Sequence, residues 1–418
     1  MGQAIEGGVA MKHPELLVPA GNLEKLRTAI LYGADAVYTG VEGLSLRAQQ
    51  AEFGMADLEV GVRIAHQQNV KVYAALNIFA RNSDLKMVRQ RVGELAEIGV
   101  DAVLVSDPGI LGIIRQVAPG LPVHLSTQAN TANAAAVRFW HGQGVSRVVL
   151  ARELNLKEVA EIGAAVPEVE LELFVHGAMC LAYSGRCLLS AYQTGRSANR
   201  GECTHPCRWE YTLLERTRPE EPLILTEDER YSYLLSSKDL RMIEYLPEIL
   251  AAGVSSLKIE GRMKTVYYVA VVTRTYRWAL DAAVRDPEGY RCDPAWLEEL
   301  DKVSNRDYTT GFYLEEKEKE FAGLNTEQSY RQSHGLAGTV LAYLPAEGKI
   351  LVELRNQLVA GAETELLLPD ATITLDSKAM TDETGQPLAA GHNKYRVYFP
   401  VDRAVPVGAV LRRRLARV

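Results

Sequence analysis

The sequence predicts an α/β fold: a (β/α)8 TIM-like barrel with a cysteine-rich insertion between strands seven and eight, followed by a small C-terminal antiparallel β-barrel domain. Three observations lead to this prediction. Eight short apolar segments recur before residue 261, amphipathic helical stretches separate most of them, and six strand-like segments without helices follow near residue 335. Alternating strands and helices are typical of parallel barrels. A doubly wound open sheet is the alternative, but no G-x-G-x-x-G follows the first strand, which counts against a dinucleotide-binding fold.

The expected barrel strands are mostly near-continuous apolar runs of four to seven residues, as is typical of parallel strands buried on both faces. They are residues 16–19, 36–39, 70–76, 102–106, 123–126, 147–150, 171–175 and 257–260.

Helices are expected between most of these strands because apolar residues there recur at helical spacing. One is residues 84–98 and another is residues 156–166. Asn22, Ser83 and Asn155 stand where N-caps are expected.

After the barrel, six short segments separated by turns predict an antiparallel barrel: residues 340–344, 350–354, 365–368, 372–375, 395–399 and 410–414. We therefore expect a disordered tail at 1–13, a catalytic barrel at 14–334 with its insertion at 176–255, and a C-terminal domain at 335–418. Arg412, Arg413, Arg414 and Arg417 form a modest basic patch in the last segment.

Composition limits the possible partners. The 418 residues are 47% hydrophobic and carry a formal net charge of −7, so any contact with RNA needs a local basic patch. No apolar run reaches the roughly 18 residues of a membrane helix, and no secretory signal is apparent. We expect a cytoplasmic protein that does not associate with membranes.

Four of the five cysteines, Cys180, Cys187, Cys203 and Cys207, lie in the insertion with the spacing C-x6-C-x15-C-x3-C. Four thiolates suit an iron–sulfur cluster or zinc. The absence of a C-x2-C pair and the proline before Cys207 favour a cubic 4Fe-4S cluster, with zinc as the alternative. Disulfides are rare in cytosolic proteins, and buried unliganded thiols are the remaining possibility.

In a barrel, active sites form at the C-terminal ends of the strands. Polar residues at these positions include Asn77, Gln128, Arg152, Glu153, His176, Glu260 and Arg262, and Arg47 lies in the loop after the second strand. A charged pair at the end of a buried strand is costly unless it is paired or faces a ligand. The alternatives are that His176 is structural and that Arg47 is an ordinary exposed arginine.

The insertion also combines arginines with aromatic residues, namely Arg186, Arg196, Arg200, Arg208, Tyr183, Tyr192, Trp209 and Tyr211. This mixture binds unstacked bases and phosphates. Solvated arginines and tyrosines that pack around a cluster are the equally good alternative.

The motif E-x-F-x-x-G-A-M-C-x4-G-x-C-x-L-S at Glu172–Ser190 resembles the signature of the U32 peptidase (collagenase-like) family. GECTHPCRWEY and SLKIEGRMKTVYYVA further resemble the branch that hydroxylates the wobble uridine of tRNA. The resemblance covers roughly residues 14–330 and, more loosely, the C-terminal domain. It implies hydroxylation at C5 with prephenate, a dicarboxylate, as the hydroxyl donor. The expected partners are tRNA and a protein of the same family.

On this reading the four insertion cysteines hold the cluster. Arg47, Arg152, Arg262, Asn77 and Gln128 are candidates for substrate binding, and Glu153, His176 and Glu260 for proton transfer. Two other functions remain open. One is a peptidase, although the sequence has no G-x-S-x-G or H-E-x-x-H. The other is a non-catalytic iron–sulfur scaffold.

Overall fold

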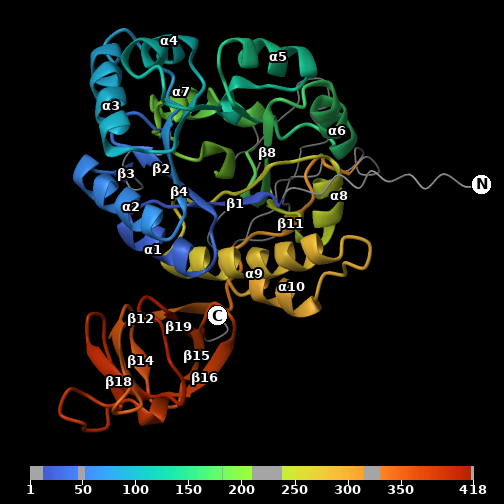
Figure 1. The fold of residues 1–418 in the computed structure, drawn as a ribbon. Helices are drawn as coiled ribbons and strands as arrows, with labels where there is room; N and C mark the ends of the chain where they lie inside the picture. Colours follow the sequence, from blue (N-terminus) through green and yellow to red (C-terminus); the bar gives the residue numbers. More distant parts are fainter. Residues whose placement is uncertain (1–12, 46–51, 181, 210–237, 315–329, 416–418) are drawn as a thin grey trace, which may run out of the picture.

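The computed structural model describes residues 13–45, 52–180, 182–209, 238–314 and 330–415 (Figure 1). Arg47, Tyr211, Arg417 and all but His13 of the predicted N-terminal tail lie outside these residues, as does the Arg208 side chain. Among the described helices, none combines the length and apolar character needed to cross a bilayer.

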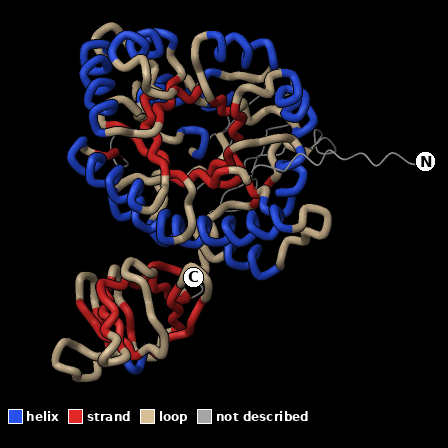
Figure 2. Tube along the Cα trace, viewed as in Figure 1, coloured by secondary structure: helices blue, strands red, loops and turns tan. Residues whose placement is uncertain are grey.

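Eight parallel strands form a closed barrel, as the sequence predicts, and helices surround it as an outer ring (Figure 2). The closure comes from β10, which pairs with both β1 and β8. In chain order the strands are β1 (Glu15–Pro19), β2 (Ala36–Val41), β4 (Lys71–Leu76), β5 (Ala102–Val105), β6 (Val123–Leu125), β7 (Arg147–Val149), β8 (Glu170–Ala178) and β10 (Ser256–Ile259).

The outer helices are α1 (Leu23–Leu31), α2 (Met55–Gln67), α3 (Leu85–Ile98), α4 (Pro108–Val117), α5 (Ala134–Gly142), α6 (Leu156–Ala165), α8 (Leu246–Ala251), α9 (Val266–Arg285) and α10 (Pro294–Asp301). Asn22 and Asn155 cap α1 and α6 through their side chains, as predicted. Ser83 is not the cap of α3. The residue before α3 is Asp84, whose carboxylate instead accepts hydrogen bonds from the Arg81 amide and from Arg200.

The insertion leaves the barrel at the end of β8. Its described part consists of short elements: η2 (Tyr183–Gly185), α7 (Leu189–Thr194), η3 (Ala198–Arg200) and η4 (Pro206–Arg208). The chain then returns as β9 (Asp239–Arg241), which pairs antiparallel with the end of β8. β11 (Tyr308–Thr309) extends this sheet beside β9, and the short β3 (Glu52–Phe53) pairs with β2.

The C-terminal domain is an antiparallel sheet in the order β16-β15-β19-β12-β13-β18. After β16 the chain pairs with β18 through Thr381 and Tyr398, which brings the two ends of the sheet toward closure. The strands are β12 (His334–Leu344), β13 (Lys349–Leu354), β15 (Glu363–Leu367), β16 (Thr372–Asp376), β18 (Arg396–Pro400) and β19 (Val410–Arg414), with a separate pair, β14 (Leu358–Val359) and β17 (Ala390–Gly391).

The C-terminal domain docks on α1, α9 and α10 of the barrel (Figure 1). Leu367 and Val410 belong to the hydrophobic core of the barrel rather than to that of their own domain. The Tyr32 hydroxyl donates to the Leu367 carbonyl at 2.8 Å and accepts from the Val410 amide at 3.0 Å. Arg412 is fully buried here, so the predicted basic patch loses one of its members to the domain interface.

Candidate active site

A cavity of about 650 Å³ opens where the barrel strands end and the insertion begins. Cationic groups dominate the charge of its described lining, which contains one carboxylate, that of Glu260. The five Arg and Lys side chains are Arg152, Arg186, Lys258, Arg262 and Lys264. This arrangement attracts anionic ligands such as carboxylates and phosphates.

The four insertion cysteines Cys180, Cys187, Cys203 and Cys207 all line this cavity. Cys187 is held by Asn199, whose side chain accepts from its amide at 3.1 Å and donates to its carbonyl at 2.9 Å. Within the described residues, no three His, Cys, Asp or Glu side chains converge closely enough to hold a single metal ion. The thiols thus share one cavity without meeting at one point.

Two predicted arginines reach the cavity from different strands. Arg152, after β7, donates to the Ala178 carbonyl at 3.0 Å, and its guanidinium carbon lies 3.8 Å from the Phe174 ring centre. Its buried Nε has no hydrogen-bond partner in the described structure. Arg262, after β10, is 4% exposed, and its Nη1 donates to the Ser45 hydroxyl at 3.3 Å. Both guanidiniums are held by protein contacts and still border the cavity.

Glu260 is held at the cavity by two tyrosines. The Tyr38 hydroxyl lies 3.0 Å from Glu260 Oε2 and 3.0 Å from the Ile259 carbonyl oxygen. The Tyr268 hydroxyl donates to the Glu260 carbonyl at 2.9 Å. Burial and the neighbouring Glu260 charge raise the pKa of Tyr38 well above its usual value, so Tyr38 remains a protonated donor at neutral pH.

Asn77 and Gln128 also line the cavity and contact each other, with Asn77 Nδ2 donating to Gln128 Oε1 at 2.9 Å. The buried Asn77 Oδ1 has no partner among the described residues. A buried amide oxygen without a partner costs free energy, so it is suited to accept a hydrogen bond from a ligand.

Two predicted residues do not line the cavity. The Glu153 carboxylate accepts from the Ser184 amide and hydroxyl, both at 2.7 Å, and so anchors the insertion to the barrel. The ring of His176 packs among Tyr268, Tyr276 and Tyr308. Burial lowers the pKa of His176 to about 3, so its imidazole is neutral at pH 7.

Sequence reasoning missed Lys258 and its partner Glu172. Lys258 lies inside β10 and lines the cavity, with its Nζ 2.7 Å from Glu172 Oε1 and 4.4 Å from the Tyr38 ring centre. Glu172 is fully buried and also contacts Arg147 at 3.3 Å. A signal was present in the sequence, because a charged residue within an apolar strand needs a buried partner, and both strands carry one.

Comparison with known proteins agrees with this architecture. Residues 21–323 match the profile described as peptidase family U32, and residues 332–412 match that of the U32 C-terminal domain. The chain is 40% identical over 409 residues to tRNA hydroxylation protein P1 of Bacillus subtilis (strain 168), covering 97% of this chain and 96% of that protein.

Two further relatives carry RNA-modification names. Identity with tRNA hydroxylation protein P of Escherichia coli (strain K12) is 36% over 442 residues, covering 96% of each chain. Identity with the 23S rRNA 5-hydroxycytidine C2501 synthase of the same strain is 39% over 272 residues, covering 65% of this chain and 40% of that protein.

Proposed function

Because this chain belongs to peptidase family U32, and its relatives over nearly its full length are named for tRNA hydroxylation, we propose that it is an RNA-modifying enzyme that hydroxylates a uridine of tRNA. The finer proposal is C5 hydroxylation of the wobble uridine with prephenate as the source of the hydroxyl group. One observation carries the proposal beyond similarity: four cysteines and five cationic side chains line a single cavity at the active-site end of the barrel.

The positive charge of the cavity lining is suited to both proposed substrates, prephenate and RNA. Prephenate carries two carboxylates and RNA carries a phosphate at every nucleotide, and either needs cationic partners that are largely desolvated. Arg152 and Arg262 are assigned to the carboxylates, because guanidiniums bind them bidentately and these two border the cavity from different strands. Asn77 Oδ1 is assigned to a substrate donor group.

We assign Cys180, Cys187, Cys203 and Cys207 to a 4Fe-4S cluster. In such a cluster each iron takes one thiolate, so the four sulfurs surround a volume rather than a point. Zinc needs four ligands within about 2.3 Å of one ion. The cavity that the four thiols share is consistent with a cluster, and zinc remains the alternative. When bound, the cluster would supply one-electron chemistry at this cavity.

The proton-transfer role is assigned to Glu260 rather than to His176 or Glu153, because Glu260 alone of the three borders the cavity. Its carboxylate is within hydrogen-bond distance of the Tyr38 hydroxyl, which limits its rotation and aims it.

The metal content of anaerobically purified protein tests the cofactor. We expect iron and sulfide in near-equal amounts, and their loss when any one of the four insertion cysteines is replaced by alanine. Cys292→Ala is the matched control, because Cys292 does not border the cavity. Detection of zinc without iron would indicate that the four cysteines form a structural zinc site. Absence of both metals, with one cysteine alone essential for peptide hydrolysis, would favour the peptidase function instead.

Mass spectrometry of tRNA nucleosides tests the activity. Unmodified tRNA incubated with the iron-loaded protein and prephenate should gain one oxygen on a wobble uridine, and omission of prephenate should abolish the gain. Iron-loaded protein that binds a protein partner but never modifies RNA would support the scaffold function and refute the enzyme.

A further inference from the structure

Large apolar side chains are exposed on the segments that line the cavity. Of the eleven large hydrophobic side chains exposed in the described residues, Leu188, Met263 and Tyr330 line the cavity, and three more lie within three residues of a lining residue: Tyr183, Tyr192 and Trp209. Tyr192 is 85% exposed and Leu188 is 77% exposed. Single exposed apolar residues are normal, but a group of them beside a cavity marks an interaction surface.

The segment that presents these side chains is tied down on both sides of the rim. Ser184, next to Tyr183, is bound to Glu153, and Arg186 Nε donates to the Gln128 carbonyl at 2.7 Å. The segment after α7 is held by Ser190, whose hydroxyl donates to the Arg196 carbonyl at 2.7 Å and contacts the Thr204 hydroxyl at 3.0 Å. The exposed rings therefore sit on a fixed support, which reduces the entropy lost when they bind a ligand.

Cationic side chains accompany the exposed rings. Arg186 borders the cavity, with its guanidinium carbon 5.5 Å from the Phe79 ring centre, and Arg196 is exposed just after α7. Aromatic faces next to arginines bind single-stranded nucleic acid, because the bases stack on the rings and the phosphates pair with the cations. A hydrophobic protein partner would not need the five cations in the adjoining cavity.

We propose that Tyr183 and Tyr192 stack the bases of a single-stranded RNA loop that flank the nucleotide entering the cavity, and that Leu188 packs against these bases. We call these three residues the rim platform. This inference rests on the proposed RNA-modifying function and adds the surface that selects an unpaired loop over a duplex. The enzyme reaches a base only when the base leaves its stack, and the platform would replace the lost stacking of the neighbouring bases.

Fluorescence anisotropy with an RNA hairpin carrying the anticodon loop tests the rim platform, with the stem duplex without its loop as the comparison ligand. Tyr192→Ala and Tyr183→Ala should each weaken hairpin binding by about 10-fold and leave duplex binding unchanged. Tyr192→Phe should bind as the wild type does, because stacking requires the ring and not the hydroxyl.

Two exposed aromatic residues away from the cavity serve as matched controls: Tyr395 of the C-terminal domain, 50% exposed, and Phe139 of α5, 60% exposed. Their alanine variants should bind the hairpin as the wild type does. If Tyr395→Ala weakens binding and the rim variants do not, the loop lies on the C-terminal domain and the inference is overturned. Rim variants that bind normally while the wild type still hydroxylates tRNA would also overturn it and leave the proposed function intact. A wild type that neither binds the hairpin nor modifies tRNA would overturn both.

Discussion

At the scale of single residues, the buried ion pair of Lys258 and Glu172 is the feature that most needs explanation. Desolvation lowers the pKa of Lys258, and the Glu172 carboxylate counteracts this effect. A second contact links Glu172 to Arg147, which in turn reaches Glu170 and Glu15 at the opposite end of the strands. A buried charge is tolerated only when paired, so this network fixes the ammonium at the floor of the cavity.

Removal of Lys258 should therefore destabilise the barrel. Lys258→Met keeps the length of the side chain but leaves Glu172 with Arg147 as its remaining ionic partner in the described residues. We expect the free energy of unfolding to fall by about 3 kcal/mol in urea titrations. The double variant Lys258→Met/Glu172→Gln should recover part of this loss, because the carboxylate left behind is neutralised.

Lys157→Met is the control for this pair, since Lys157 is exposed at the start of α6 and its loss should change stability little. Equal stability of Lys258→Met and the wild type would show that the ion pair contributes nothing.

Whether the sequence predicted a cavity residue correctly depended on the position of that residue relative to the end of its strand. Asn77, Gln128, Arg152, Glu260 and Arg262 follow their strands and do border the cavity. The sequence did not predict Lys258 as a site residue, because Lys258 lies within β10, where a residue is expected to fill the core. His176 was placed at the strand end, yet β8 continues to Ala178, which leaves its ring within the protein among tyrosines. Sequence alone does not tell how far a strand extends.

At the scale of secondary-structure elements, Gly177 shapes the junction of β8 and β10. The register of this pair shifts between Lys258 and Ile259. Gly177 has a φ of +104°, and a Cβ there would lie 2.4 Å from the Glu260 carbonyl oxygen. The close approach of the two strands places Glu260 and requires a residue without a side chain.

Gly177→Ala should thus destabilise the fold through both backbone strain and this collision, by about 3 kcal/mol in total. Gly253→Ala separates the two causes, because Gly253 has a φ of +76° and nothing within 4 Å of its Cβ position. We expect a loss of about 1 kcal/mol for Gly253→Ala. Chemical denaturation of both variants measures the loss in unfolding free energy of each. Equal losses would mean that β8 and β10 move apart to accommodate the methyl group without cost.

The elements differed in how well the sequence predicted them. The eight barrel strands were recognisable because parallel strands buried on both faces form near-continuous apolar runs, and helical patterns separate most of them. The two-residue strands β14 and β17 were not, since a single pairing leaves no periodicity. β12 begins at His334, whereas the sequence predicted a start at residue 340. Gly335 and Gly338 interrupt the apolar pattern, and the pairing register shifts between Leu336 and Gly338 and again between Val340 and Ala342.

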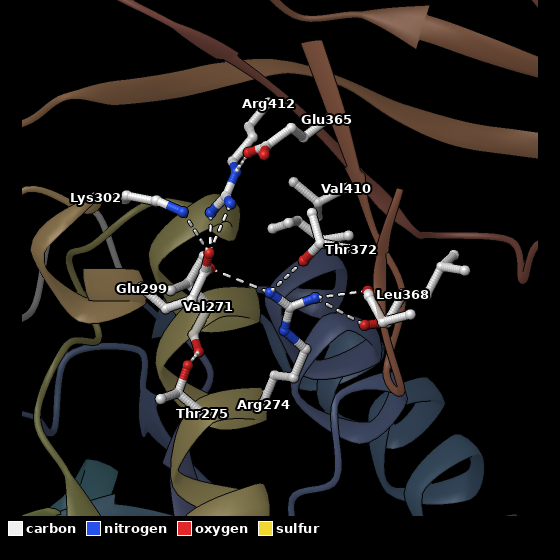
Figure 3. Close-up of polar contacts among 12 residues, drawn as sticks. Val271, Arg274, Thr275, Glu299, Lys302, Glu365, Leu368, Thr372, Val410 and Arg412 are labelled. Atoms are coloured by element: carbon white, nitrogen blue, oxygen red, sulfur yellow. Dashed lines mark hydrogen bonds and ion pairs between the residues drawn. The ribbon is translucent and has the colours of Figure 1, made fainter. Parts of the chain in front are cut away.

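At the scale of the whole molecule, a shared carboxylate joins the two domains. Glu299 of α10 binds Arg412 of β19 at 2.7 and 2.8 Å, Arg274 of α9 at 3.1 Å, and Lys302 at 2.8 Å (Figure 3). Arg274 also donates to the carbonyls of the C-terminal segment at Leu368 and Ala371, both at 2.9 Å. The predicted basic patch was wrong for Arg412, because its guanidinium is buried in the domain interface, where it pairs with Glu299.

This interface predicts a pH-dependent stability. Burial alone would raise the pKa of Glu299, but the hydrogen bonds and charges of Arg412 and Lys302 outweigh burial and lower the pKa to about 2. A depressed carboxyl pKa stabilises the folded state above the unfolded value of about 4.5, and this contribution is lost as the pH falls toward 2. Glu299→Gln should consequently cost about 3 kcal/mol at pH 7, and the difference from the wild type should shrink between pH 4.5 and 2.

Glu363→Gln is the matched control. Glu363 of β15 forms an exposed ion pair with Arg414 of β19 at 3.1 Å. An exposed pair contributes under about 1 kcal/mol, so this variant should unfold like the wild type at every pH.

Calorimetry of the full chain adds a readout specific to the interface. If Glu299 couples the domains, we expect one transition for the wild type and two for Glu299→Gln, with the barrel and the C-terminal domain melting independently. A Glu299→Gln variant that retains one transition at an unchanged temperature would mean that the apolar contacts of Leu367 and Val410 hold the domains together without the ion cluster.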